Sequence, residues 1–285
     1  MNNDKGGFAM DIKCIALDLD KTTLNRQGKL SKGNREALIS AMKKDVHIVI
    51  ASGRAFSTLP KDVTSLPGIE YAITSNGAAI YHIPTGTCMH SYHLTPASVN
   101  DILTVCKSYP VVFEAFIDGT AYGEKHYIEN PVFYGTPPNV ISYVQQTRNP
   151  INHMPDFIRQ HANCLDSIDV VTGDIRIKQK IQTELARISN DIYITSSVPR
   201  LLEISHKDSG KHSGLKYIQN HLHLKPEQTA AFGDGDNDID LLLAAGTGIA
   251  MENASPSCKT AADAITKHHD EDGVAWGMRH ILHII

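Results

Sequence analysis

Two acidic side chains that could do chemistry stand two residues apart at the end of an apolar run, Asp18 and Asp20 in the stretch IALDLDKTT. A second acidic cluster, GDGDND over residues 233–238, follows the apolar run TAAF far along the chain. In a parallel sheet the ligand crevice lies beyond the carboxyl ends of the strands, so the two clusters converge there if both runs belong to one sheet. Crowded carboxylates repel one another unless a cation neutralises them, and oxygen ligands suit a hard divalent ion. The two clusters therefore predict a metal site, and we expect Mg²⁺ in it.

The elements that position these clusters alternate between strand and helix at both ends of the chain. In the first part we expect buried strands over 12–17, 46–51 and 69–74, and a helix over 35–44 that Ser31 caps. The last part resumes the alternation. We expect strands there over 228–232, 248–251 and 264–267. We expect helices over 214–222, over 237–245, where Gly246 stops the helix, after Ser255-Pro256, and from Gly273.

The middle of the chain has a different pattern. Two strands flank an Asp118-Gly119 turn within 111–127, which is a hairpin signature. Strands over 167–173, 192–197 and 200–205 and a helix over 177–188 complete a mixed, antiparallel segment. The stretch 130–163 is rich in Pro and Asn, and its pattern assigns no elements. We therefore expect an α/β fold in which a doubly wound parallel-sheet core, residues 1–83 and 198–285, is interrupted by an inserted α+β domain, residues 84–197.

Composition narrows the class of protein. The 285 residues are 41% hydrophobic and 20% charged, as in a soluble globular enzyme. The net charge of −4, without a basic stripe, argues against a nucleic-acid partner. The five cysteines have no CxxC spacing, so we expect buried free thiols in a reducing compartment. The first ten residues contain no apolar segment and no stretch approaches the ~20 apolar residues of a membrane span, so we expect a cytoplasmic protein without a signal peptide or membrane contact.

Four motifs in order along the chain resemble those of the haloacid dehalogenase superfamily, specifically the Cof-type phosphatases, whose large cap is inserted after the third core strand. The motifs are the Asp18–Asp20 pair, the Ser52-Gly53-Arg54 stretch, Lys211 and the 233–238 cluster. The resemblance covers roughly the first 80 and the last 85 residues well. In the cap it extends only to the pattern of strands and helices. It implies a Rossmann-like core with a mobile cap and Mg²⁺-dependent hydrolysis of a phosphate monoester.

The first motif carries the covalent chemistry in this family. Asp18 resembles the nucleophile, which forms an aspartyl-phosphate and so splits a slow hydrolysis into two easier steps. Asp20 resembles the general acid and base, and its backbone carbonyl resembles a ligand of Mg²⁺. Thr22 matches the family, and we expect it to steady the loop by a side-chain hydrogen bond. Lys21 stands where the family has glycine, and its side chain either points to solvent, the reading we favour, or offers positive charge to the substrate.

The second motif resembles a phosphate-binding turn. The Ser52 hydroxyl and adjacent amides, that of Gly53 among them, would bind the transferring phosphoryl group, and a helix starting just after Gly53 would add its N-terminal dipole. A hydroxyl before a glycine is also an ordinary helix cap. Arg54 either reaches the substrate or braces the loop.

The third motif supplies a cation. Lys211 opens a predicted helix and precedes the fourth motif by the usual distance, so its ammonium would offset the repulsion between aspartate and phosphate. His212 replaces the glycine that commonly follows in the family. Three other lysines, Lys207, Lys216 and Lys225, lie close in sequence, and register favours Lys211.

The fourth motif is expected to hold the metal. Asp234 resembles the direct ligand, Asp238 the residue that holds the metal or its water, and Asn237 the residue that orders the loop. A calcium-binding EF-hand loop is excluded, because its required glycine at position six is Ile239 and its bidentate glutamate at position twelve is Ala245.

Polar residues at further strand ends would line the entrance to the site. Asn76, followed by Gly77, and Asn253 resemble family positions there, although structural turns are an alternative reading. The fifteen histidines include His221-x-His223 and His268-His269, which lack a third ligand at metal-binding spacing, so we expect them at the surface or at helix ends.

The resemblance implies an enzyme, a phosphoric monoester hydrolase that acts on a small phosphorylated metabolite, with a sugar phosphate as the expected class. No obligatory protein partner is evident in the sequence. Two other functions stay open at this point. A phosphohexomutase uses the same aspartyl-phosphate, and a non-catalytic protein could bind phosphorylated metabolites in the same crevice.

Overall fold

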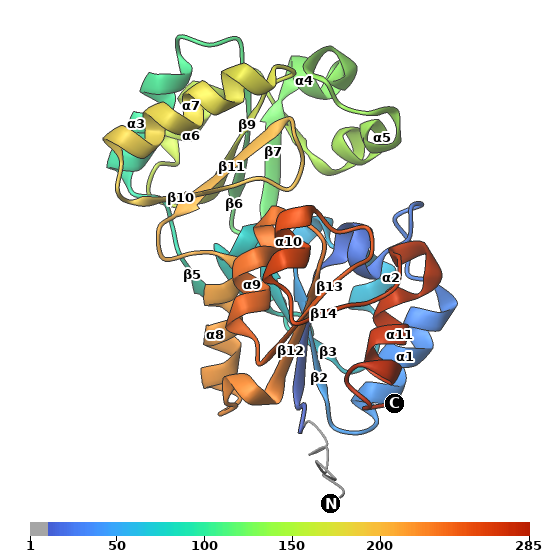
Figure 1. Ribbon diagram of the computed structural model, residues 1–285. Helices are drawn as coiled ribbons and strands as arrows, with labels where there is room; N and C mark the ends of the chain where they lie inside the picture. The colour runs from blue at the N-terminus through green and yellow to red at the C-terminus, as the bar shows by residue number, and fades with distance from the viewer. Residues whose placement is uncertain (1–10) are drawn as a thin grey trace, which may run out of the picture.

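The computed structural model describes residues 11–285, in which two sheets lie one above the other in Figure 1. The prediction that the first ten residues contain no signal peptide lies outside the described residues. Among residues 11–285, no helix is long and apolar enough to cross a membrane.

The lower sheet has eight strands in the order β14-β13-β12-β1-β2-β3-β4-β5. Six are parallel: β1 (Cys14–Leu17), β2 (His47–Ala51), β3 (Ile69–Thr74), β12 (Thr229–Gly233), β13 (Thr247–Ala250) and β14 (Ala264–Ile265). The antiparallel strands β4 (Ala79–His82) and β5 (Thr87–Ser91) form one edge. All four residues of β1 are buried, because helices cover both faces of a parallel sheet and leave no strand face for polar side chains.

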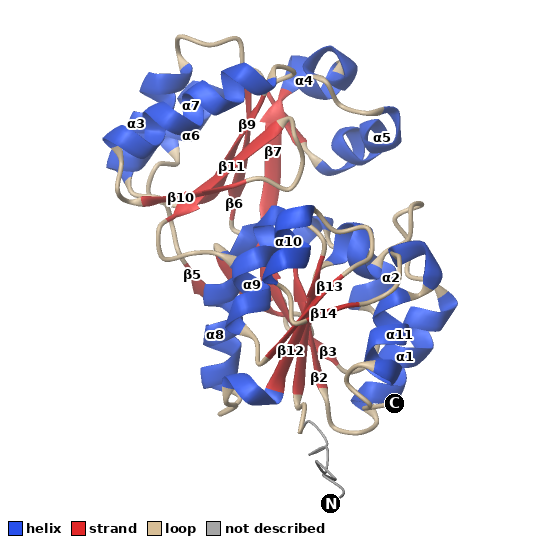
Figure 2. Ribbon diagram, in the orientation of Figure 1, coloured by secondary structure: helices blue, strands red, loops and turns tan. Residues whose placement is uncertain are grey.

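Helices lie on both sides of this sheet, as Figure 2 shows in blue against red. One side carries α8 (Lys211–His221), α9 (Ile239–Ala244) and α10 (Pro256–Ala261), and the other carries α1 (Lys32–Met42), α2 (Lys61–Thr64) and α11 (Gly273–His280). The Ser31 hydroxyl caps α1 by accepting from the amide of Asn34 at 3.2 Å, which confirms the predicted helix start. The doubly wound α/β core is therefore confirmed.

The upper sheet has six strands in the order β10-β11-β9-β6-β7-β8. Their bounds are β6 (Val112–Ile117), β7 (Thr120–Glu124), β8 (Asn149–Ile151), β9 (Leu165–Val171), β10 (Ile192–Thr195) and β11 (Leu201–His206). The pairs are antiparallel except that β7 and β8 run parallel. Asp118 and Gly119 both have positive φ, 48° and 71°, as the predicted two-residue hairpin turn between β6 and β7 requires.

Side chains of the upper sheet alternate between an apolar face and a face turned to a cavity. Phe113 and Ala115 of β6, Ile168 of β9 and Ile204 of β11 belong to a hydrophobic core. The helices α3 (Pro96–Cys106), α6 (Met154–Gln160) and α7 (Ile175–Ile188) supply the other side of that core. Because successive strand residues point to opposite faces, Glu114 and its counterparts on β9 and β11 face away from this core.

The domain boundaries differ from the predicted ones. Strand β5 lies beyond residue 83 but pairs with β4 in the lower sheet, and β11 lies beyond residue 197 but pairs with β9 in the upper sheet. The upper unit therefore begins after Ser91 and includes His206. The β4–β5 hairpin continues the lower sheet beyond residue 83. Strand β11 completes the upper sheet before the chain returns to the lower unit.

The unassigned stretch 130–163 contains α5 (Pro138–Thr147), β8 and α6, and it follows α4 (Lys125–Glu129). Proline stands in the first turn of both α5 and α6, where its missing amide is not needed. The prolines that suggested irregular structure therefore mark helix starts. All five cysteines are free as predicted, but Cys88 is exposed and Cys164 half-buried, so only Cys14, Cys106 and Cys258 are buried as expected.

Asp166 in β9 gives stability a pH dependence. Its side chain is buried, and burial raises the pKa of this carboxyl to about 7, although the amide of Gly119 donates to it at 3.3 Å. Between pH ~4 and ~7 the folded state then holds a proton that the unfolded state has lost, so stability falls as the pH rises through this window.

We predict that Asp166→Asn removes this loss of stability on raising the pH. Relative to the wild type, the free energy of unfolding of the variant should be higher at pH 8 than at pH 5, by up to about 3 kcal/mol. Urea denaturation at both pH values measures it, and Asp45→Asn, at an exposed position, is the control. An equal difference at both pH values would contradict the prediction.

Candidate active site

Three adjacent parallel strands end at the predicted site. Asp18 follows β1, Ser52 follows β2 and Asp234 follows β12, and these strands are neighbours in the order β12-β1-β2. The structure therefore brings together acids that are 216 residues apart in the sequence, 18 and 234. This is the edge at which ligands bind in open α/β sheets.

A buried ammonium group lies between two of the acids. Lys211 is the first residue of α8, and its Nζ donates to Asp18 Oδ1 at 2.7 Å and to Asp238 Oδ1 at 2.6 Å. The side chain of Lys211 has 0% exposure. Burial by itself lowers the pKa of Lys211, but the charges of Asp18 and Asp238 outweigh burial and raise it, so the group is a fixed cation.

Side-chain hydrogen bonds join the first loop to the fourth. The Thr22 hydroxyl donates to Asp234 Oδ1 at 3.1 Å, and the Thr23 hydroxyl donates to the carbonyl of Asp18 at 2.6 Å. Asp238 Oδ2 accepts from the amides of Asp234 and Gly235, both at 3.0 Å. The loops that carry the acids are therefore held by contacts among the motifs themselves.

The acids fit a divalent cation. Oxygens of Asp18, Asp234 and Asp238 lie within 4.8 Å of one another. Burial raises the pKa of Asp18 well above its usual value, and burial together with Asp238 raises the pKa of Asp234 to about 7. Both oxygens of Asp238 already accept hydrogen bonds, so Asp18 and Asp234 offer the carboxylate oxygens that could bind a metal directly. Carboxylate oxygens of this kind suit Mg²⁺.

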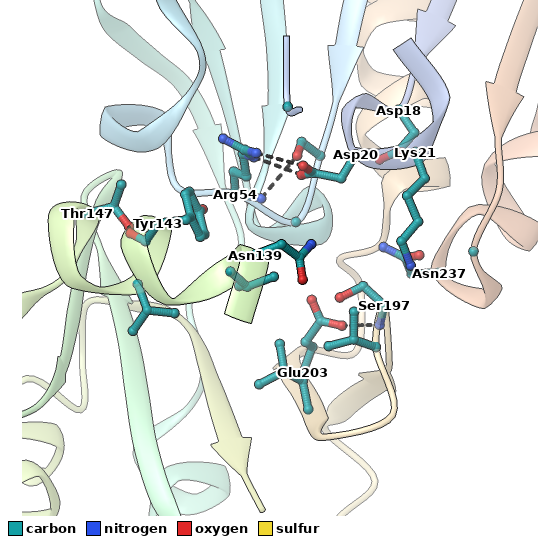
Figure 3. Close-up of a pocket in the computed structure, with 18 of the residues that line it drawn as sticks. Asp18, Asp20, Lys21, Arg54, Asn139, Tyr143, Thr147, Ser197, Glu203 and Asn237 are labelled. Carbon is teal, nitrogen blue, oxygen red and sulfur yellow. Dashed lines mark hydrogen bonds and ion pairs between the residues drawn. The ribbon is translucent and has the colours of Figure 1, made fainter. Parts of the chain in front are cut away.

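Asp20 is held by an arginine from the second motif, as the dashed lines in Figure 3 show. Arg54 donates from Nε to Asp20 Oδ2 at 2.8 Å and from Nη2 to Asp20 Oδ1 at 2.6 Å. The guanidinium also lies over the ring of Tyr143 from α5, 4.5 Å from its centroid. Arg54 therefore fixes the orientation of the Asp20 carboxylate and joins it to the upper unit.

The turn after β2 differs from the prediction. Ser52 is buried and its hydroxyl accepts from the amide of Arg54 at 3.2 Å. The expected helix directly after Gly53 is absent; a 3₁₀ turn spans Phe56–Thr58, and α2 begins only at Lys61, after Pro60. The phosphate-binding turn therefore offers its hydroxyl and amides without the N-terminus of a helix.

Asn76 connects the lower sheet to the upper one. Its backbone has φ 51°, and its Oδ1 accepts from Asn237 Nδ2 at 3.0 Å while its Nδ2 donates to Glu203 Oε1 at 3.0 Å. Gly53 lies against this pair, because a Cβ there would be 3.1 Å from Glu203 Oε1 and 3.2 Å from the Asn76 amide. Asn76 thus holds the side chains of Asn237 and Glu203 in position by hydrogen bonds.

Asn253 supports the first loop from behind. Its Nδ2 donates to the carbonyl of Lys21 at 2.9 Å, and its Oδ1 accepts from the amide of His269 at 3.0 Å. Like Asn76, Asn253 is absent from the side chains that line the cavity described below. The structure places both asparagines beside the entrance as braces.

Lys21 keeps the turn that glycine would make. Its φ of 60° lies in the left-handed region that favours glycine, so a lysine adopts the backbone conformation expected at this position. Its side chain lines the cavity and extends toward Asn237 in Figure 3. Lys21 is exposed, as the favoured reading expects, and it also lines the cavity, where the other reading needs its charge.

A cavity of about 750 Å³ lies between the motifs and the upper sheet. Sequence analysis missed most of its upper wall, which includes Glu114, Phe116, Asn139, Tyr143, Arg148, Asp169, Arg200 and Glu203. Acids inside three largely apolar strands, Glu114, Asp169 and Glu203 among them, were the signal that could have found part of it. His269 was expected at the surface or at a helix end. It begins the 3₁₀ turn His269–Glu271 but is buried, lines the cavity and lies 2.9 Å through Nδ1 from the carbonyl of Leu24.

Known proteins show the same architecture. The family model for haloacid dehalogenase-like hydrolases matches residues 15–278. Phosphatase YwpJ of Bacillus subtilis is 30% identical over 287 residues, covering 95% of this chain and all of the relative. The 5-amino-6-(5-phospho-D-ribitylamino)uracil phosphatase YcsE of the same organism is 30% identical over 275 residues, covering 95% of this chain and 96% of the relative. The solved structure of the subclass IIB sugar phosphatase BT4131 superposes with a TM-score of 0.80 at 22% identity, covering 96% of this chain and 100% of that one, and shows the fold. The chain therefore belongs to the haloacid dehalogenase superfamily, as a phosphatase whose second unit is inserted into the core.

Proposed function

We propose that this phosphatase is Mg²⁺-dependent and releases inorganic phosphate from a small phosphorylated metabolite through an aspartyl-phosphate on Asp18. The observation that carries the proposal is the contact of Asp18 with the buried Lys211, beside Ser52 and Asp234 at adjacent strand ends. A buried cation next to a carboxylate lets a phosphate dianion approach that carboxylate.

In the first step Asp18 attacks phosphorus in line with the leaving oxygen. The bond from phosphorus to that oxygen breaks, and Asp20 gives the oxygen its proton. In the second step Asp20 takes a proton from water, whose oxygen attacks the acyl-phosphate and frees Asp18. Arg54 holds the Asp20 carboxyl in one orientation for both transfers.

The remaining motif residues stabilise charge. The hydroxyl of Ser52 and the amides beside it, including that of Gly53, would bind the equatorial oxygens of phosphate together with Lys211. Held by Asp18, Asp234 and the backbone carbonyl of Asp20, Mg²⁺ would neutralise these oxygens and the crowded carboxylates.

The substrate is proposed to be a sugar phosphate or a related hydroxylated ester. The cavity of about 750 Å³ has room for a small molecule, and charged side chains form much of its upper wall. The name of one relative specifies a ribitylamino-uracil phosphate, and the name of one similar solved structure specifies a sugar phosphatase. Both names support this class of substrate. Because the relatives are named phosphatases, water is favoured over a second sugar hydroxyl as the acceptor, and hydrolysis over binding alone.

A phosphate-release screen tests the function. Sugar phosphates, nucleotides and vitamin phosphates are incubated with the protein, with Mg²⁺ or with EDTA. We expect release from at least one ester with Mg²⁺ and a loss of at least about 100-fold with EDTA, because Lys211 alone then offsets the charges of the acids and of the phosphate. An inert protein across the panel would refute the proposal.

Removing the nucleophile should abolish turnover. Asp18→Asn leaves the shape of the site but cannot form the aspartyl-phosphate, so kcat should fall by at least about 10³-fold. Asp45→Asn, at an exposed position, is the matched control. Wild-type turnover by Asp18→Asn would exclude Asp18 as the nucleophile.

Removing the buried cation should impair both folding and activity. Lys211→Met leaves Asp18 and Asp238 buried without their partner, so in EDTA the free energy of unfolding should fall by about 3–5 kcal/mol. Activity should fall at least about 100-fold. Lys216→Met, exposed on the same helix α8, controls for loss of a lysine. The assignment fails if Lys211→Met behaves like the control in denaturation and turnover.

A further inference from the structure

Three carboxylates form a row across the upper sheet. Glu114 of β6 pairs in register with Asp169 of β9, and Asp169 pairs with Glu203 of β11. All three line the cavity, yet their exposures are only 1%, 5% and 5%. Like charges on directly opposite residues of a sheet destabilise it, so this row needs compensation.

The two outer members of the row have partners. Arg148 donates to Glu114 Oε2 from Nη2 at 2.7 Å and from Nε at 3.0 Å. Glu203 accepts from Asn76 at 3.0 Å and from the amide of Ser197. These two carboxylates are therefore satisfied by the protein itself.

The middle member has none. No residue among those described donates a hydrogen bond to Asp169. Burial and the charges of Glu203 and Glu114 raise its pKa, against the lowering effects of Arg148 and Arg200. The Asp169 oxygens are not closed off from the cavity, so a carboxyl in this wall that receives no donor from the described residues can bind a ligand there.

Arg200 lines the same cavity and also has an unmet group. Its Nη1 donates to the hydroxyl of Tyr127 at 3.4 Å, but its buried Nε has no acceptor among residues 11–285. The buried Nε is closed off from the cavity, so what Arg200 can offer a ligand is the rest of its guanidinium. The wall thus holds an acceptor without a donor from the described residues, Asp169, and a cation, Arg200.

We infer that Asp169 and Arg200 bind the leaving group of the substrate, and that this leaving group carries hydroxyls. The inference rests on the proposed phosphatase function and assigns the residues that select the ester. A hydroxyl can donate to Asp169 and accept from Arg200 at once. Three carboxylates against two arginines also make an ammonium a competing ligand of this wall, which the test below separates from a hydroxyl, whereas a leaving group with neither would leave Asp169 without a donor.

The stability of an Asp169 variant distinguishes a binding role of this residue from a structural one. Asp169→Asn conserves volume and removes a charge between two carboxylates, so it should not lower the melting temperature. If Asp169 were there to hold the sheet together, the same change would lower it. A carboxylate that the fold does not need, in the wall of the site, is a specificity residue.

The test compares esters with and without hydroxyls on the leaving group. The ratio of kcat/KM for glucose 6-phosphate, ribose 5-phosphate and sorbitol 6-phosphate to that for p-nitrophenyl phosphate is measured for the wild type, Asp169→Asn and Arg200→Gln. For the best hydroxylated ester we expect each variant to lower this ratio at least about tenfold, because sites built to bind a hydroxyl discriminate strongly. Asp166→Asn, a buried acid of the same strand outside the cavity lining, should leave the ratio unchanged.

Each other result overturns the inference. An unchanged ratio in Asp169→Asn and Arg200→Gln would exclude the assigned residues, and so would a reduced melting temperature of Asp169→Asn with equal loss on all esters. A preference for glucosamine 6-phosphate over glucose 6-phosphate that depends on Asp169 would indicate an ammonium instead. If the wild type cleaves p-nitrophenyl phosphate but no hydroxylated ester, the phosphatase function stands and the inference fails. If it cleaves none, both fail.

Discussion

The ion pairs of Lys211 with Asp18 and Asp238 are the interaction on which the rest of this site depends. Three buried or half-buried acids at one sheet edge would repel one another, and the ammonium is the cation that the chain itself supplies among them. Because α8 begins at Lys211, the start of the helix sets the position of the ammonium. Its other partner, Asp238, orders the loop that carries Asp234, so one cation organises both acidic clusters.

Two chains of contacts carry this organisation from the lower sheet to the upper one. Asn237 binds Asn76, which binds Glu203 on β11, and Asp20 binds Arg54, which lies against Tyr143 on α5. The residues that would act on phosphate are therefore in contact with the wall that would bind the leaving group. The phosphate and the leaving group of a substrate would therefore contact neighbouring parts of one hydrogen-bonded network.

Much of the core was predictable, because buried parallel strands are continuous apolar runs and polar residues directly after them must share an edge. That logic places Asp18, Ser52 and Asp234 together. It could not find Arg54–Tyr143 or Glu203–Asn76, whose partners come from the lower and upper units and depend on how these pack. It also misjudged 130–163, where prolines start helices, and the stretch after Gly53, where Pro60 delays one. The strand pattern did not reveal the row of Glu114, Asp169 and Glu203, since register across three strands is a tertiary property.

The contacts that span the cavity have a kinetic consequence. Widening the mouth to admit a ligand would break contacts that join the two units, the Glu203–Asn76 hydrogen bond and the Arg54–Tyr143 ring contact among them. These two alone are worth about 2–4 kcal/mol. A gap of at least that size would leave the widened form populated at no more than roughly one molecule in thirty. Gating between the two sheets, as well as bond cleavage, would then set how long a product stays bound.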